Sequence, residues 1–204
     1  MINKLNRAFI FDLDGVITET SEYHYMAWKT VCKKIGYDLT RKKNEELKGV
    51  NRKKCLDMIM EWGNIRLSEK EIESLLEAKN KIYKDYIKDL NENDVCEGVL
   101  NFINDAIKNN IKIALYSASR NAKRILCQLK IIDLFTVIID GNNVSNAKPD
   151  PEGFKIAADL TKTNAKDCVV LITLCKLLTR SAAFLLKCDC NAFSISAKLI
   201  VSFP

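Results

Sequence analysis

Four short apolar runs stand out along this chain of 204 residues. The first covers residues 7–11, and three more follow in the second half at 111–117, 135–140 and 168–172. Each is too short for an ordinary helix and is bounded by polar or turn-forming residues. Continuous apolar runs of this kind are typical of strands buried on both faces of a parallel sheet.

Helical patterns separate the three later runs. We predict helices over about residues 99–109 and 120–130, and a third that Pro151 opens. Strands that alternate with helices of ten or more residues indicate βαβ units. The sequence therefore predicts an α/β fold with a Rossmann-like parallel sheet.

The stretch between the first run and the others is helical and contains few strand signals. Apolar residues recur at i, i+3 and i+4 spacing around residues 56–60 and 72–76. Ser68 followed by Glu71 matches a capping box at the start of a helix. We therefore expect a small helical domain inserted after the first strand. Its predicted range is 19–92, and the α/β core comprises 1–18 and 93–204.

Composition narrows the class of protein. Hydrophobic residues make up 48% of the chain and charged residues 28%, as in soluble globular proteins. No stretch approaches the roughly 18 to 20 uninterrupted apolar residues of a membrane span. The N-terminal residues reach the carboxylates Asp12 and Asp14 before a secretory segment could form, so we expect a cytoplasmic protein without a membrane partner.

The distribution of charge argues against a nucleic-acid-binding protein, and the cysteine pattern argues against a disulfide-linked one. The net charge is +6, but the lysines are dispersed among acidic residues, whereas nucleic-acid binding needs a concentrated basic stripe. We therefore expect no nucleic-acid partner and only a mild attraction for small anions. The eight cysteines are mostly scattered singly, which indicates reduced structural thiols.

Polar side chains follow the ends of the predicted strands. Asp12 and Asp14 follow the first, Ser117 and Ser119 lie at the end of the second, and Lys148 comes after the third. In a parallel sheet these ends meet at one edge. One carboxylate could act as nucleophile or metal ligand and the other as general acid/base. A hydroxyl and an ammonium group could hold a phosphoryl group, with Mg²⁺ bound by the oxygen ligands.

Each of these motifs is weak by itself. An Asp-x-Asp-Gly sequence is common in turns, and Lys-Pro-Asp usually marks the start of a helix. Their joint placement after successive strands resembles the haloacid dehalogenase superfamily of phosphotransferases. The three motifs of that superfamily correspond to Phe11-Asp-Leu-Asp-Gly-Val16, Ser117 and Lys148 in AKPDP. The helical insertion resembles the small cap domain of the superfamily.

Finer features resemble the β-phosphoglucomutase group. They lie in five stretches, GVITETSEYHYMAW (15–28), ELKGVNR (46–52), AKNKIY (78–83), IKIALYSASRNA (111–122) and NAKPDP (146–151). The resemblance covers about residues 7–171. It implies a mutase that interconverts β-glucose 1-phosphate and glucose 6-phosphate through an aspartyl phosphate and a bisphosphate. A sugar-phosphate phosphatase and a non-catalytic phosphosugar-binding remnant are the alternatives.

The resemblance implies a role for each residue of the site. Asp12 would be the nucleophile and Asp14 the general acid/base, and both would hold Mg²⁺. Ser117 and Lys148 would hold the transferring phosphoryl group, while Arg52 would bind the distal phosphate. The protein would act as a monomer on a small phosphorylated sugar.

Further residues would surround the sugar or couple closure of the cap to the placement of the acid/base. His24, the only histidine, would be a helix-surface residue if the flanking motif were absent. With the motif, a relay role is the better interpretation. Substrate-binding positions are Gly49, Val50, His24, Trp28, Lys79, Ser119, Arg120 and Asn121. The relay would comprise Thr20, His24 and Lys79.

The resemblance stops after residue 171. Its fourth motif is an acidic pair that completes the Mg²⁺ site, and this chain has Ile172 and Thr173 there. Between Cys168 and the end of the chain the only acidic residue is Asp189, and all seven glycines lie at or before Gly153. Residues 172–204 are thus an atypical tail.

Three hypotheses account for the tail. It could be a genuine variant that packs as a hydrophobic helix, or Cys175, Cys188 and Cys190 could bind a soft metal. The third is a reading-frame shift, which we favour. Reading back-translated codons for ITLCKLLTRS one base earlier permits DYALQAVDAI, with an aspartate at the motif position.

The absent acidic pair has two expected consequences. Mg²⁺ would lose part of its ligand shell, so catalysis would be weak even where phosphosugar binding is retained. We also expect the last layer of the core to be incomplete. The terminal strands of the sheet would be missing, which would leave an apolar edge.

Overall fold

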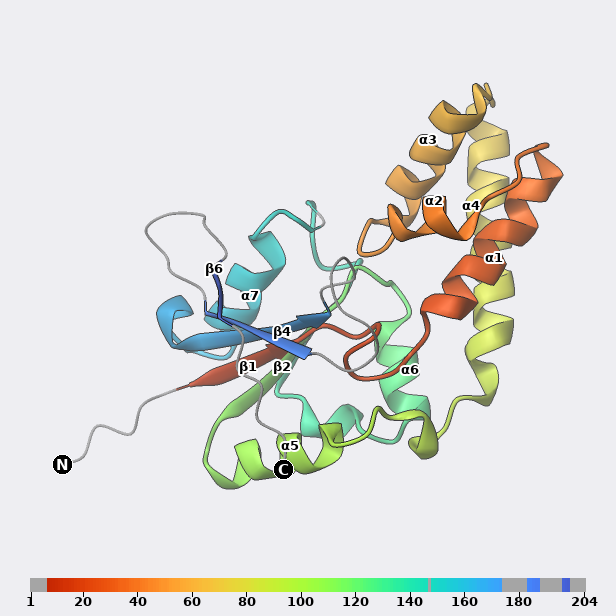
Figure 1. The fold of residues 1–204 in the computed structure, drawn as a ribbon. Helices are drawn as coiled ribbons and strands as arrows, with labels where there is room; N and C mark the ends of the chain where they lie inside the picture. Colours follow the sequence, from red (N-terminus) through yellow and green to blue (C-terminus); the bar gives the residue numbers. More distant parts are fainter. Residues whose placement is uncertain (1–6, 147, 174–182, 188–195, 199–204) are drawn as a thin grey trace. The chain divides into compact units, whose positions relative to one another are not determined.

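The computed structural model describes residues 7–146, 148–173, 183–187 and 196–198 (Figure 1). The chain divides into two compact units, which are described separately. One comprises Met1–Glu19 with Asn91–Pro204, and the other comprises Thr20–Leu90.

The first unit is built on a sheet whose four leading strands are parallel. Strand β1 (Ala8–Phe11) lies between β2 (Lys112–Tyr116) and β4 (Cys168–Thr173), and β3 (Val137–Ile139) lies beside β2. Phe11 is in register with a leucine on each side. The predicted α/β fold with a parallel sheet is confirmed, and the carboxyl ends of these strands share one edge.

Two further strands continue the sheet beyond β4. Strand β5 (Ala183–Lys187) pairs antiparallel with β4, and β6 (Ser196–Lys198) pairs antiparallel with β5. The expectation of missing terminal strands and an open edge beside β4 is therefore wrong, because β5 satisfies that edge. A helical tail is also wrong for these eight residues. Three cysteines of the proposed metal cluster lie outside the described residues, namely Cys175, Cys188 and Cys190.

Helices cover both faces of the sheet, as Figure 1 shows for α5 and α7. The helices of this unit are α5 (Val99–Lys108), α6 (Ala122–Gln128) and α7 (Glu152–Leu160), with short 3₁₀ helices at Glu92–Asp94, Ile132–Leu134 and Ala165–Asp167. Successive residues of β1 point to opposite faces. Ile10 packs in a buried cluster with Ala157 of α7, whereas Phe9 stacks on Phe102 of α5 at 5.2 Å between ring centroids. This two-sided burial explains why β1 is wholly apolar.

The second unit is helical. Its elements are α1 (Ser21–Lys34), α2 (Arg41–Glu45), α3 (Arg52–Gly63), α4 (Glu69–Tyr86) and a 3₁₀ helix at Ile87–Asp89. Trp28, Val31, Leu56 and Ile59 belong to its buried core. None of the described helices is long and apolar enough to cross a membrane.

The start of α4 has the capping box that the sequence predicts. The Ser68 hydroxyl accepts a hydrogen bond from the Glu71 amide at 3.4 Å, and the Glu71 carboxylate accepts one from the Ser68 amide at 2.8 Å. Two backbone amides at the helix start are thereby satisfied. The cap fixes where this long helix begins.

Candidate functional site

A tight turn after β1 presents the two predicted catalytic carboxylates. The amide of Asp12 donates to the Leu171 carbonyl of β4 at 2.9 Å, which fixes its backbone beside the neighbouring strand. The chain then turns back at Gly15, whose φ of 75° lies in the left-handed region that favours glycine. The Gly15 amide donates to the Thr18 carbonyl at 2.9 Å. Asp12 and Asp14 are both half-buried at this turn.

Lys148 lies directly against Asp12. Its Nζ is 2.9 Å from Asp12 Oδ1, and the two side chains are 15% and 20% exposed. The same ammonium donates a hydrogen bond to the Tyr116 carbonyl at 3.0 Å. The structure therefore brings together the first and third predicted motifs, which lie far apart in the sequence. The ammonium offsets the negative charge of Asp12, which reduces the repulsion between this carboxylate and an incoming anion.

Side-chain hydrogen bonds shape the loop after β2. Ser117 is fully buried, and its Oγ accepts a hydrogen bond from the Ser119 amide at 3.1 Å. The Ser119 Oγ accepts one from the Asn121 amide at 3.2 Å. Asn121 is buried, while Arg120 is exposed. These bonds hold the predicted phosphate- and substrate-binding positions of this loop in one conformation.

A second loop, after β3, supports the first, and our sequence analysis did not predict this role. Asp140 Oδ1 accepts a hydrogen bond from the Asn142 amide at 2.8 Å, and Asn142 Nδ2 donates to the Arg120 carbonyl at 3.4 Å. A side chain at Gly141 would place a Cβ 2.6 Å from the Ala118 carbonyl oxygen. The close approach of the two loops therefore requires glycine. A glycine between polar residues directly after a strand was the one available signal.

In the helical unit, His24 and Lys79 form a close pair. Lys79 Nζ lies 2.7 Å from His24 Nδ1, and Lys79 is only 3% exposed. An ammonium group can only donate, so Nδ1 is the acceptor and the imidazole is neutral with its proton on Nε2. The ring stacks on Tyr83, with 4.0 Å between centroids. Helices α1 and α4 thus supply the two polar groups of the predicted relay.

The surroundings keep this histidine neutral. Burial lowers the pKa of His24 well below its ordinary value of 6.5, and the positive charges of Lys79 and Arg52 lower it further. The Lys79 ammonium also lies over two rings, 5.2 Å from the centroid of Trp28 and 4.7 Å from that of Tyr83. Aromatic faces stabilise a cation that has lost most of its water.

Thr20 is the third member of the predicted relay. It is fully buried directly before α1, and its carbonyl accepts a hydrogen bond from the His24 amide at 3.1 Å. It is therefore held one helical turn from the histidine.

The segment before α3 carries the remaining predicted binding residues. Gly49 is exposed with a φ of 76°, and Val50 packs partly against the helical core. Arg52 is the first residue of α3 and is half-buried, while Asn51 caps that helix by accepting from the Lys54 amide at 2.9 Å. The start of a helix favours anions, and Arg52 adds a guanidinium there.

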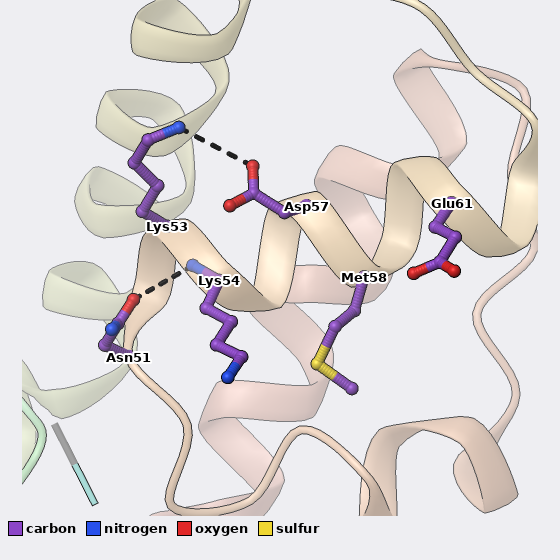
Figure 2. A pocket seen from close by; sticks show the side chains of 6 residues that line it. All are labelled: Asn51, Lys53, Lys54, Asp57, Met58 and Glu61. Carbon is purple, nitrogen blue, oxygen red and sulfur yellow. Dashed lines mark hydrogen bonds and ion pairs between the residues drawn. The ribbon is translucent and has the colours of Figure 1, made fainter. Parts of the chain in front are cut away.

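A hollow lies beside α3 (Figure 2). Its lining contains matched charges, and Lys53 pairs with Asp57 at 3.6 Å. None of the predicted site residues lines it. It is lined by Asn51, Lys53, Lys54, Asp57, Met58 and Glu61.

The side chains at the strand ends supply only part of a magnesium site. Asp12 and Asp14 offer hard oxygen ligands. At the end of β4, however, Ile172 packs against the apolar core, and neither it nor Thr173 carries a carboxylate. Among the described residues, no three acidic, histidine or cysteine side chains gather as a metal site. The residues that the structure describes therefore do not form a complete Mg²⁺ site.

Known proteins resemble this chain over the same residues. The family described as haloacid dehalogenase-like hydrolase matches residues 9–171. The match therefore ends one residue before Ile172.

Two curated proteins illustrate the range of activities among the relatives. A beta-phosphoglucomutase of Bacillus subtilis (strain 168) is 39% identical over 167 residues, which are 81% of this chain and 74% of that protein. A phosphorylated carbohydrates phosphatase of Thermotoga maritima is 30% identical over 148 residues, or 71% of this chain and 66% of that protein. One relative is thus named as a mutase and the other as a phosphatase.

A solved structure shows the same fold. The crystal structure of a beta-phosphoglucomutase from Clostridium difficile is 43% identical and superposes with a TM-score of 0.79. The match covers 81% of this chain and 75% of that one.

Proposed function

This chain belongs to the haloacid dehalogenase-like hydrolase family, and from that membership we propose that it is a sugar-phosphate mutase of the β-phosphoglucomutase type. Its relatives include a mutase and a phosphatase that acts on phosphorylated carbohydrates. The observation that supports phosphoryl transfer most directly is the contact of Lys148 with Asp12 at 2.9 Å. The expected reaction interconverts β-glucose 1-phosphate and glucose 6-phosphate.

Asp12 and Asp14 carry the chemistry in this proposal. An oxygen of Asp12 forms a bond to phosphorus as the bond between phosphorus and the departing sugar oxygen breaks. Asp14 gives its proton to that sugar oxygen. In the second half-reaction Asp14 takes a proton from a sugar hydroxyl, whose oxygen bonds to phosphorus and releases the Asp12 carboxylate.

Ser117 and Lys148 hold the transferring group. The Lys148 ammonium lies within reach of both the Asp12 carboxylate and any phosphoryl group bonded to it. The Ser117 hydroxyl accepts from the Ser119 amide and retains its own proton for donation. Donors that are already oriented need no rearrangement when charge develops.

The helical unit would recognise the rest of the substrate. Arg52 would bind the distal phosphate, because its planar guanidinium can donate two parallel hydrogen bonds. The relay of Thr20, His24 and Lys79 would couple closure of this unit to the placement of Asp14. Further contacts to the sugar would come from Gly49, Val50, Trp28, Ser119, Arg120 and Asn121.

We further propose that catalysis by this chain is weak. Family members of this type generally use Mg²⁺, and the described residues supply only part of its ligands. Two anions, a carboxylate and a phosphoryl group, must then meet with less neutralisation. Binding of phosphosugars depends on other residues and would be retained. If catalysis were lost completely, the chain would be a non-catalytic phosphosugar-binding remnant.

A phosphatase is the second candidate, and the Thermotoga maritima relative favours it. The two activities differ in what attacks the aspartyl phosphate, a sugar hydroxyl or water. Incubation with β-glucose 1-phosphate and a trace of glucose bisphosphate separates them. Glucose 6-phosphate as the main product supports the mutase, and inorganic phosphate as the main product contradicts it.

The D12N variant is the matched control for this assay. It keeps the shape of the side chain but lacks the nucleophilic charge, so it should form neither product. Product formation that survives in D12N would come from another protein or another site. The monomeric state and the cytoplasmic location remain predictions.

A further inference from the structure

The ammonium of Lys148 is enclosed by two aromatic rings. Its Nζ lies 4.8 Å from the ring centroid of Tyr116 and 5.7 Å from that of Phe154. The two rings meet edge to face, with 4.8 Å between centroids and 87° between planes. Aromatic faces attract a cation most strongly where water is excluded, and this side chain is only 15% exposed.

Two polar contacts of the Lys148 ammonium use two of its three N–H donors. An ammonium group has three N–H donors. One N–H is directed to Asp12 Oδ1 and another to the Tyr116 carbonyl. Within the described part of the chain no acceptor is found for the third N–H, which is available to an oxygen beside Asp12. A phosphoryl oxygen bonded to Asp12 would be such an acceptor.

Gly153 makes room for the ring of Tyr116. A Cβ at this position of α7 would lie 2.3 Å from Tyr116 Cζ, far inside the distance that real contacts allow. Gly153 is the second residue of α7, and the helix itself gives glycine no advantage over alanine there. The space that the ring of Tyr116 needs therefore accounts for glycine at this position.

The hydroxyl of Tyr116 makes no regular side-chain hydrogen bond in this arrangement, although the nearby backbone of Lys148 lowers the pKa that burial raises. It is buried and has no hydrogen-bond partner among the described residues. Leaving a buried polar group unpaired is unfavourable. The aromatic face, which phenylalanine would also supply, is thus the feature of Tyr116 that Lys148 uses.

We propose that Tyr116 and Phe154 are positioning residues that hold the Lys148 ammonium against Asp12 with one N–H directed at the transferring phosphoryl group. The placement of the ammonium follows from contacts within the structure, whereas the role toward phosphate rests on the proposed function. If the rings were only core residues, the carboxylate and the carbonyl would be enough to hold Lys148.

Lysine acylation at a single pH tests this placement. The full-length protein is treated with an acylating reagent, and the modification rate of each lysine is read by mass spectrometry. In Y116L the Lys148 rate should rise about tenfold, the effect expected when a desolvated cation loses an aromatic face. F154L should raise it about threefold, because that ring is more distant. Y116F should stay within about twofold of the unchanged protein.

Lys112 is the internal control. Lys112 is the first residue of β2, at the opposite end of the strand from Tyr116, and its ammonium donates to the Thr161 carbonyl. A general loosening of the core would therefore expose Lys112 as well. The proposal is overturned if Lys148 reacts equally in Y116L and the unchanged protein, or if Lys112 accelerates together with Lys148. F154L carries the same test should Y116L fail to fold.

A second arm uses Gly153. In G153A the added methyl must displace the ring, so Lys148 should accelerate as in Y116L. In the G153A/Y116L double variant the ring is absent, and alanine should add no further acceleration. Full additivity of the two effects would contradict a shared action through the ring.

Inorganic phosphate separates this inference from the proposed function. Phosphate should slow the acylation of Lys148 in the unchanged protein and in Y116F, and about tenfold more of it should be needed in Y116L. Absence of protection in every protein would contradict the phosphate-facing role and the proposed function. The pattern of rates without phosphate would still decide whether the rings hold the ammonium.

Discussion

The ends of β1 and β4 differ in chemistry although their backbones are equivalent. The two strands are parallel neighbours, and Phe11 and Leu171 are in register. One residue further on, β1 is followed by Asp12, whereas β4 continues with Ile172 and Thr173. Strand placement and site chemistry therefore depend on separate features of the sequence. Apolar residues and pairing place the strand end, and the next side chain decides what it can do.

Because of this difference, charged side chains gather at the end of β1, whereas the end of β4 is uncharged. Asp12 has a cationic neighbour in Lys148, at 2.9 Å. At the end of β4, Ile172 contributes hydrocarbon to the core cluster. A metal ion that would offset the charge of an incoming phosphoryl group lacks the ligands that β4 would supply.

Restoring carboxylates to the end of β4 should produce the largest change. I172D/T173D adds hard oxygen ligands beside Asp12 and should raise Mg²⁺-dependent turnover of β-glucose 1-phosphate by about 100-fold or more. Steady-state kinetics with and without Mg²⁺ measures the effect. The chelated sample should lose the gain.

I172N/T173N is the matched control, because it changes polarity and size without adding charge. It should give no gain. Equal rates for the asparagine and aspartate variants, or no change in either folded variant, would show that the missing acidic pair is not what limits catalysis.

Removing Arg52, which we propose binds the distal phosphate, should have the next largest effect. R52A should raise KM for the sugar bisphosphate about 10- to 100-fold, as expected when a hydrogen-bonded charge pair to a phosphate is lost. K53A, on the next residue of α3, is the control, since Lys53 is exposed and pairs with Asp57. An equal effect of K53A would indicate a general loss of positive charge.

Acid should weaken the helical unit through its single histidine. The folded-state pKa of His24 lies well below 6.5, so below pH 6.5 the unfolded chain binds a proton that the folded chain does not. The free energy of unfolding should therefore fall as pH decreases from 6.5 toward the folded-state pKa. Both tryptophans, Trp28 and Trp62, lie in this unit, so denaturant unfolding followed by their fluorescence measures it.

The H24N variant should remove this part of the pH dependence. An NMR titration of the His24 ring in the intact protein gives the folded pKa directly. A midpoint at or above 6.5 would contradict a neutral imidazole held by Lys79.

Loss of the α4 cap should have the smallest effect. S68A removes the hydroxyl that accepts from the Glu71 amide, and a helix cap of this kind contributes about 1 kcal/mol. Tryptophan fluorescence should report a lower unfolding midpoint, while acylation of Lys148 in the other unit should be unchanged. S68T keeps a capping hydroxyl and should restore most of the loss.

Local features of the sequence were sufficient for much of the fold. The apolar runs predicted β1, β2 and β4 to within one or two residues. Strands buried on both faces are continuously apolar, so the first polar residue marks each end. The pair of Ser68 and Glu71 predicted the start of α4, because capping depends on residues only three apart. Strands β5 and β6 were missed, since their segment contains neither glycine nor proline to mark a turn between strands.

The site was less accessible from sequence. Asp12, Ser117 and Lys148 could be proposed because each follows a predicted strand. The aromatic enclosure of Lys148 could not, because Tyr116 lies on a strand and Phe154 on a helix, and only their packing brings the rings together. Gly153 within a helix was the one local sign of a close approach.

The family match ends at the position where the composition of the chain changes. The match ends at residue 171, and the acidic pair is absent directly after it. This coincidence agrees with the hypothesis of a reading-frame shift near residue 172. Sequencing the gene across codons 165–204 tests the frameshift hypothesis. If the gene encodes the printed residues without an inserted or deleted base, the hypothesis is wrong and the tail is a genuine variant.

Turnover by the unchanged protein tests the central claim most directly. The claim is that this chain retains phosphosugar binding but lacks the carboxylates for efficient phosphoryl transfer. The purified 204-residue protein is given β-glucose 1-phosphate, a trace of bisphosphate and Mg²⁺, and binding is measured in parallel by calorimetry. We predict clear binding with fewer than about 0.1 turnovers per second, well under the usual range for enzymes. Mg²⁺-dependent turnover above about 10 per second would contradict the claim.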